Sequence, residues 1–295
     1  MDIRFGTLEG QSSETLYQAF MEAFADYAVP INVTMDDFLA MQRRRGVSYA
    51  ASVGAFDGDR IAGFIFNGDG DWKGRRCAYD AGTGVLPAYR GGGLSGALAA
   101  ESLRLLRTLG FERWLLEVLV DNEKAIRTYR KAGFTTTRRF SCPDGSVPDA
   151  AAHLSDLAAA ARVRIGPLMD RDVSRFASWR IWEPSWQNSD ASLARTPETL
   201  RLLGAWDAAA SHYGDEEPVG YIVATAKGSV FQLAVRPDAR RRGIGRTLVA
   251  ALAALTPGHK VRCVNVQADD EATLGLLAGM GISGGPDQWE MELEL

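Results

Sequence analysis

A short phrase occurs twice in this chain, and it constrains the fold more than any other feature of the sequence. The first copy spans residues 84–96 (GVLPAYRGGGLSG) and the second spans residues 234–245 (AVRPDARRRGIG). Gly93 and Gly243 occupy the same place in the two copies, 150 residues apart. Each copy is typical of a β-strand that enters a glycine-containing loop and opens a helix. The sequence therefore predicts two copies of one fold.

Loops of this kind are suited to binding anions. Successive glycines let several backbone N–H groups point to one place, and the helix that follows adds the positive end of its dipole. One such loop is weak evidence, because strand-to-helix corners also use glycine for the turn alone. Two copies in register favour a function. The chain has no Gly-x-x-x-x-Gly-Lys-Ser/Thr phrase, which argues against a nucleoside triphosphate and leaves a pyrophosphate as the expected anion.

Length and composition agree with two globular domains. The chain has 295 residues, of which 46% are hydrophobic and 24% are charged, so each half can bury a core. We expect an N-terminal domain over residues 1–145, a connecting segment over 146–161 and a C-terminal domain over 162–295. An alanine-rich helix over 150–161, with Asp149 placed to cap it, would form the connection. The alternating residues 289–295 would form the last strand of the second sheet.

Charge and residue usage argue against several classes of function. The net charge of −4 and the pI of about 5.5 disfavour a nucleic-acid or membrane-binding surface. The three cysteines and three histidines are scattered without metal-ligand spacing, so we expect no metal site. We find no secretory leader and no apolar run long enough to span a bilayer, which favours a cytoplasmic protein. A homodimer is compatible with the sequence.

A second phrase follows the first glycine-rich loop and makes a family resemblance visible. It reads Asn122-x-x-Ala125-x-x-x-Tyr129-x-x-x-Gly133-Phe134, directly after an apolar strand over residues 114–120. Together with Arg-x-x-Gly-x-Gly/Ala at the loop, from which the first copy departs only at Ser95, it resembles the GNAT superfamily of acyl-CoA-dependent N-acyltransferases in its tandem two-domain form. The resemblance covers residues 1–142 and 162–295 and implies an α/β (α+β) fold. Each domain would have a mixed, twisted sheet flanked by helices and splayed between its fourth and fifth strands.

The resemblance implies acetyl-CoA as cosubstrate, bound along the fourth strand, the loop and the following helices. In the first half we expect contacts from Val85, Leu86, Arg90, Gly91, Gly92, Gly93, Leu94, Ser95, Gly96, Asn122 and Tyr129. In the second half the corresponding residues are Val235, Arg240, Arg241, Gly243 and Gly245, and whether this half binds the coenzyme stays open. Asn122 also suits the N-cap of its helix, and the two roles can coexist.

Tyr129 is the residue that the resemblance assigns to general acid catalysis, as proton donor to the departing CoA thiolate. A half-buried structural tyrosine is the alternative. An ammonium acceptor must lose a proton, so a carboxylate is expected near it. Asp80 on the fourth strand is the first candidate base and Glu117 on the fifth strand is the second. Asp80 lies one residue from the family position, so a bulge would be needed to aim it into the site.

The second half lacks the chemistry-bearing side chains. Leu277 aligns with Tyr129, Asp270 aligns with Asn122, and no carboxylate stands in the place of Asp80. We therefore expect the first half to transfer an acetyl group from acetyl-CoA to a primary amine of a small molecule by direct attack, without a covalent enzyme intermediate. Two alternatives are a non-catalytic acyl-CoA-binding sensor or assembly module, and a tandem acyltransferase whose C-terminal half is active.

Acceptor specificity is expected from the first helices and the hairpin loop. The candidates are Glu22, Asp26, Tyr27, Asp36, Asp37 and residues 67–72, which supply carboxylates and aromatic rings. A solvated acidic surface is the alternative for each of them. Trp179, Trp182 and Trp186 recur at helical spacing, which predicts burial between the two halves rather than a ligand cage.

Overall fold

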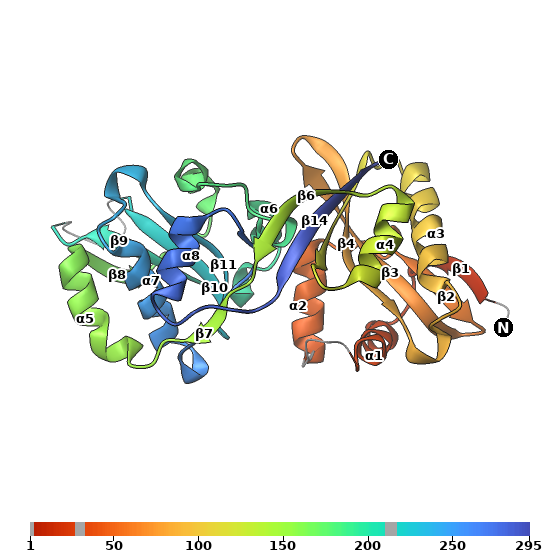
Figure 1. Ribbon diagram of the computed structural model, residues 1–295, viewed down its shortest axis with the longest axis horizontal. Helices are drawn as coiled ribbons and strands as arrows, with labels where there is room; N and C mark the ends of the chain where they lie inside the picture. Colours follow the sequence, from red (N-terminus) through yellow and green to blue (C-terminus); the bar gives the residue numbers. More distant parts are fainter. Residues whose placement is uncertain (1–2, 27–32, 210–216) are drawn as a thin grey trace. The chain divides into compact units, whose positions relative to one another are not determined.

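The computed structural model describes residues 3–26, 33–209 and 217–295, which divide into two compact units (Figure 1). The first unit comprises residues 1–138 together with 289–295, and the second comprises residues 139–288. Tyr27 lies outside the described residues. Within the described part of the chain, no helix is both long and apolar enough to cross a membrane.

The first unit alternates strands and helices. Its elements are β1 (Ile3–Thr7), α1 (Ser13–Ala23), α2 (Met35–Arg45), β2 (Val53–Asp57), β3 (Arg60–Trp72), β4 (Arg75–Val85), α3 (Leu94–Thr108), β5 (Arg113–Leu119), α4 (Glu123–Ala132) and β6 (Thr135–Ser141), the last of which runs on into the second unit. A 3₁₀ turn over Pro87–Tyr89 precedes α3.

The second unit repeats most of this order. Its strands and α-helices are β7 (Asp144–Ser146), α5 (Ala150–Ala161), β8 (Val163–Pro167), α6 (Asp190–Ala194), β9 (Leu200–Asp207), β10 (Gly220–Thr225), β11 (Ser229–Val235), α7 (Ile244–Ala254), β12 (Lys260–Cys263), β13 (Val266–Gln267) and α8 (Glu271–Ala278). Short 3₁₀ segments lie at Val173–Trp179, Trp186–Asn188, Pro197–Thr199, Pro237–Ala239 and Pro257–His259. The helix α5 packs against α7 inside this unit and has no counterpart in the first. Asp149 does not cap α5 as expected, because its backbone is left-handed (φ 60°) and its side chain makes no cap bond.

The final strand, β14 (Asp287–Glu294), corrects one expectation. The larger sheet has the order β1-β2-β3-β4-β5-β14-β6-β13, and the smaller has the order β7-β12-β11-β10-β9-β8. Residues 289–295 therefore complete the first unit rather than the second sheet, and Figure 1 shows β14 beside β6. Met291 of this strand is buried in the core of the first unit, and Glu290 forms a buried two-point ion pair with Arg138 at 2.6 and 2.8 Å.

Both sheets splay where the resemblance predicts. β4 pairs in parallel with β5 only from Cys77 to Asp80, and β11 pairs with β12 only at Ser229 and Val230. Beyond these points the parallel neighbours diverge. The strand before the splay also bulges in both units, at Ala81 and at Phe231, which are 150 residues apart like the glycine loops. The repeat therefore extends to an irregularity of the backbone.

Helices cover both faces of the first sheet. On one face, α3 and α4 bury Leu98 and Tyr129 with Leu116 of β5. On the other face, the ring of Phe38 of α2 contacts the ring of Phe66 of β3 with centroids 6.1 Å apart. Successive side chains of a strand point to opposite faces, so neighbouring residues of β4 serve different faces of the site.

Candidate functional site

The start of α3 in the first unit is an open set of backbone donors. Gly91 and Gly93 have φ values of 89° and 81°, which turn the chain into the helix as only glycine does easily. Within the described residues, the N–H groups of residues 91–95 make no hydrogen bond. A Cβ built at Gly91, Gly92, Gly93 or Gly96 would meet nothing within 4 Å. Donors in open space at a helix N-terminus fit a diphosphate.

Arg90, the arginine of the Arg-x-x-Gly phrase, holds the strand-to-helix corner (residues 84–96) in place through hydrogen bonds of its side chain. Its guanidinium donates to the carbonyl of Val85 at 3.0 Å, to the carbonyl of Ala23 at 2.9 Å, and to Asp26 at 2.6 Å. Arg240 repeats two of these bonds, to the carbonyls of Val235 and Trp179. In both units this arginine joins the end of the strand before the loop to an earlier segment. These are β4 and the end of α1 in the first unit, and β11 and Trp179 in the second. The backbone of the loop, rather than this side chain, is left to face an anion.

The backbone of Leu86 is likewise not free to bind the coenzyme. Its N–H donates to Ala62 and its carbonyl accepts from Tyr89, so both backbone groups are used within the chain. Its side chain is 1% exposed. Leu94 and Ser95 in the first turn of α3 are partly exposed, and Leu94 packs against the core of the first unit.

Tyr129 and Asp80 meet on the α3/α4 face of the sheet. The Tyr129 hydroxyl donates to Asp80 Oδ2 at 3.1 Å, and the ring packs edge-on against Phe134. The same Oδ2 accepts from Thr83 Oγ1 at 2.6 Å, and Oδ1 accepts from the N–H of Gly82 at 3.0 Å. The bulge at Ala81 allows this tight turn of Asp80 onto its own strand. The expected bulge is therefore present, and it aims Asp80 at Tyr129.

Burial dominates the electrostatics of Asp80. The side chain is 5% exposed, and this burial raises the pKa of Asp80, while the hydrogen bonds from Thr83 and Tyr129 oppose the shift. The carbonyl of the bulged Ala81, freed from the ladder, accepts from Arg45 Nη1 at 2.6 Å. The backbone groups at the bulge thus have hydrogen-bond partners: the carbonyl of Ala81 bonds Arg45 and the N–H of Gly82 bonds Asp80.

Glu117 lies with Tyr79 on the other face, toward α1 and α2. The Tyr79 hydroxyl donates to Glu117 Oε2. Burial raises the pKa of Glu117 to about 7, an effect that Tyr79, Arg45 and Arg138 oppose and Glu290 reinforces. Burial also raises the pKa of Tyr79 well above its usual value, so that hydroxyl stays a donor. A carboxyl group that titrates near neutral pH is suited to general base catalysis.

Asn122 caps α4 with its side-chain oxygen, which leaves its side-chain N–H groups available as donors. Its Oδ1 accepts from the N–H of Ala125 at 3.2 Å, whereas its side-chain amide makes no hydrogen bond among the described residues. In the second unit Asp270 caps α8 through Thr273, and its other oxygen accepts from the indole of Trp182 at 3.0 Å. The place of the Asn122 donor is therefore taken by a tryptophan contact.

The second glycine corner is partly covered by its own unit. Arg241 and Gly243 repeat the positive φ values of the first loop, 64° and 89°. However, Gly245 is buried, and a Cβ there would lie 3.0 Å from Leu276 of α8. Almost the whole of α7 is buried, from Ile244 to Ala253, whereas the first turn of α3 is open. Leu277, in the place of Tyr129, is 0% exposed.

The splay of the second sheet is bridged by the chain itself. Gln232 of β11, 150 residues after Gly82, donates to the carbonyl of Asn188 at 2.7 Å. The side-chain amide of Asn188 in turn donates to the carbonyl of Val264 at 2.6 Å. The segment that carries the tryptophan run thus joins β11 to the residue that follows β12. This arrangement favours the first corner over the second as a coenzyme site.

The tryptophan run is buried, but not as a regular α-helix. Trp179 ends a 3₁₀ segment and stacks on Phe176 at 4.4 Å, and Trp186 begins another. Trp179 and Trp186 are 7% and 2% exposed, with Trp179 in the core of the second unit. Trp182 is only partly buried. The spacing predicted the burial of Trp179 and Trp186 correctly, but Trp179 is buried inside the second unit rather than between the two halves, and the expected helix is wrong.

The remaining charged candidates are mostly engaged in structural contacts. Glu22 pairs with Arg60, Asp37 forms a capping box with Thr34, and Asp36 lies in the first turn of the same helix. In the second unit the arginines around the loop have partners in Asp238, Asp207 and the carbonyl of Gly279. Arg241 is exposed and makes no ion pair among the described residues.

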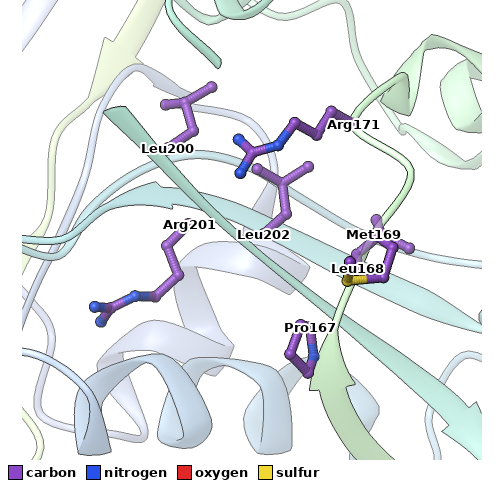
Figure 2. A pocket seen from close by; sticks show the side chains of 7 residues that line it. All are labelled: Pro167, Leu168, Met169, Arg171, Leu200, Arg201 and Leu202. Carbon is purple, nitrogen blue, oxygen red and sulfur yellow. The ribbon is translucent and has the colours of Figure 1, made fainter. Parts of the chain in front are cut away.

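A cavity of about 270 Å³ lies apart from these corners. Figure 2 shows its lining side chains, which come from β8, β9 and the loop between them: Pro167, Leu168, Met169, Arg171, Leu200, Arg201 and Leu202. None of them belongs to the repeated phrase or to the Tyr129 cluster. The two guanidinium groups at its edge donate to backbone carbonyls of Pro197 and Leu255.

Comparison with known proteins identifies the class. The family model described as "Acetyltransferase (GNAT) family" matches residues 13–134 and 176–282. This chain belongs to the GNAT acetyltransferase family, with a family domain in each half.

Among curated proteins, similarity is partial. A mycothiol acetyltransferase of Streptomyces scabiei is 31% identical over 134 residues, which cover 43% of this chain and 41% of that protein. An N-alpha-acetyltransferase 30 of Schizosaccharomyces pombe is 31% identical over 87 residues, 29% of this chain and 58% of that protein. The matches thus span less than two thirds of either relative.

Solved structures match over nearly the whole chain. A tandem GNAT protein from the clavulanic acid biosynthesis pathway has a TM-score of 0.71 at 16% identity, covering 99% of this chain and 98% of that one. A GCN5-related N-acetyltransferase from Sphaerobacter thermophilus has a TM-score of 0.69 at 14% identity, covering 99% and 95%. The tandem fold expected from the sequence is confirmed.

Proposed function

We propose that this chain is an N-acetyltransferase that moves the acetyl group of acetyl-CoA to a primary amine, with its chemistry in the first unit. The observation that carries the proposal is the contrast between the two corners. The donors of residues 91–95 are open and Asn122 has an unused amide donor, whereas in the second unit a Cβ at Gly245 would meet Leu276, and Asp270, in the place of Asn122, accepts from Trp182. Acetyl-CoA, when bound, supplies the activated thioester.

Two side chains divide the acid and base roles. Tyr129 would give its proton to the departing sulfur, and Glu117 would take the proton that the amine loses. Glu117 is the better base because it lies on the α1/α2 face and its pKa is raised to about 7 by burial. Both oxygens of Asp80 already accept hydrogen bonds from its own strand or from Tyr129.

Direct attack by the amine needs no enzyme nucleophile. Cys77 of β4 is the cysteine nearest in sequence to the site, but it is 0% exposed, and burial raises its pKa far above the ordinary thiol value. A thiol that stays protonated is a poor nucleophile. The three cysteines are buried and form no disulfide among the described residues, which supports our proposal of a reducing, cytoplasmic location.

The test is steady-state release of the coenzyme thiol from acetyl-CoA with a panel of primary amines. The panel contains the acceptor of mycothiol acetyltransferases, peptides with free N-termini, spermidine, glucosamine and amino acids. We expect turnover with at least one amine and its loss in Tyr129→Phe. Binding of acetyl-CoA without turnover of any amine would favour the sensor alternative. Full activity of Tyr129→Phe would move the chemistry to the second unit.

A further inference from the structure

Thr83 and Asp80 form a hydrogen-bonded chain with Tyr129 that the acid and base roles above leave unused. Thr83 Oγ1 lies 2.6 Å and Tyr129 Oη lies 3.1 Å from one and the same oxygen, Asp80 Oδ2. Asp80 is 5% exposed and Tyr129 is 9% exposed. Because the Tyr129 hydroxyl contacts this buried carboxyl group, the protonation state of Asp80 affects how readily Tyr129 gives up its proton.

The difficulty for Tyr129 acting alone is electrostatic. When Tyr129 gives up its proton, a phenolate forms beside Asp80. If Asp80 is then a carboxylate, two negative charges share a buried space of low dielectric, which strongly disfavours the transfer. If Asp80 carries a proton on Oδ2, the same hydrogen bond can run in the opposite direction, from Asp80 to the phenol oxygen.

We propose that Asp80 is a proton relay behind Tyr129, and that Thr83 is the positioning residue that holds the relay in line; both roles rest on the proposed function. The C–S bond of the thioester breaks and its electron pair stays on sulfur. Tyr129 passes its proton to that sulfur and receives the proton of Asp80 Oδ2 in the same event. Asp80 becomes a carboxylate and regains a proton from solvent before the next turnover.

The surroundings of Asp80 suit both ends of this step. Burial raises the pKa of Asp80, which favours the protonated form before transfer. After transfer, the N–H of Gly82 and the hydroxyl of Thr83 are already in place to donate to the new carboxylate. The bulge at Ala81 fixes all three groups on one turn of β4. The second unit has Val230 in the place of Asp80 and keeps the bulge without the relay.

The test is a proton inventory, which measures kcat of the full chain in mixtures of H₂O and D₂O with the best amine of the panel. Wild type is expected to give a curved plot, because two protons move together, and Asp80→Asn a linear one with kcat lowered about as far as in Tyr129→Phe. The double variant Asp80→Asn/Tyr129→Phe should be no slower than Tyr129→Phe alone. Thr83→Val should lower kcat about tenfold with KM unchanged, and Thr83→Ser should restore it. Thr108→Val, whose exposed hydroxyl bonds only the carbonyl of Arg104, is the matched control.

The outcomes separate the relay from the proposed function. A linear inventory in wild type, or independent and multiplying losses in the double variant, would overturn the relay while leaving the acetyltransferase intact. Thr83→Ser as slow as Thr83→Val would overturn the positioning role. Absence of turnover in wild type with every amine would overturn the proposed function and the relay together.

Discussion

The two units share one backbone plan and differ in what fills it. Both have the left-handed glycine loop, the bulge before the splay and the arginine that ties the strand to the preceding segment. In the first unit, Gly82 leaves space beside β4, where a Cβ would meet only Phe66 at 3.8 Å. In the second, Gln232 extends from the equivalent position and is bonded to Asn188. Duplication thus preserved the scaffold, while side chains decided which copy keeps an open site.

Removal of residues 289–295 should produce the largest difference between the units, because it should destabilise the first unit and leave the second folded. This deletion takes Glu290 from Arg138, Glu292 from Arg113 and Glu294 from Arg75. Breaking a buried ion pair costs about 3–5 kcal/mol on its own. Hydrogen-exchange mass spectrometry should show lost protection in residues 3–138 and retained protection in residues 144–278. Equal protection of both units after the deletion would contradict the role given to β14.

Tyr129→Phe should lower kcat by roughly 10²–10⁴-fold, the usual contribution of general acid–base catalysis. The fold should be unaffected, because the ring and its contact with Phe134 remain. The matched variant Leu277→Met in the second unit changes a buried side chain at the aligned position and should leave kcat near wild type. Steady-state kinetics and circular dichroism of both variants make the comparison.

Glu117→Gln should remove the pH dependence that the base imposes. A base works when deprotonated, so the wild-type kcat/KM should rise as the pH increases through about 7 and level off above it. Burial is the main cause of this raised pKa, Glu290 on β14 raises it further, and Tyr79 on β4, Arg45 on α2 and Arg138 on β6 lower it. The variant should lose about 10²-fold at pH 8 and show no such limb. A limb near pH 7 that persists in Glu117→Gln would assign the base elsewhere.

Gly92→Asp should weaken coenzyme binding about tenfold. Its carboxylate would repel the diphosphate and compete with it for the helix N-terminus, where a negative charge is worth up to ~2 kcal/mol. Gly92 has space for the side chain and no positive φ, so the fold should tolerate it. Arg241→Asp changes the charge of the second loop by two units, against one unit in Gly92→Asp, and should still leave the Kd unchanged in calorimetry. Arg241 is the better partner for this test than Arg240, which holds Val235 and Trp179. Equal weakening by both substitutions would mean that both loops bind the coenzyme.

The sequence predicted the local features of the fold better than the long-range ones. The repeated phrase predicted both loops, and the one-residue offset of Asp80 indicated where a bulge would be needed, because these features depend on neighbouring residues. The alternation of residues 289–295 correctly predicted a strand but not its sheet, since alternation says nothing about which edge a strand joins. Its partners, Arg138 and the core of the first unit, are far away in sequence.

The site shows the same division. Motif positions predicted Asp80, Glu117 and Tyr129 as candidates, whereas nothing in the sequence indicated their partners Thr83 and Tyr79. Thr83 contacts Asp80 only because the bulge curls the strand, and Tyr79 reaches Glu117 across two parallel strands. The filling of the second splay was missed for a similar reason, because Asn188 lies 44 residues from Gln232 along the chain. The presence of Gln232 where the first copy has glycine was the available signal.

The most direct test of an open first corner and a partly covered second one is titration of the ¹⁵N-labelled chain with acetyl-CoA, followed by amide NMR. The account predicts that the amide signals of residues 91–95 shift on binding, as donors to the diphosphate, while those of residues 241–246 stay in place. Shifts confined to residues 241–246 would contradict it.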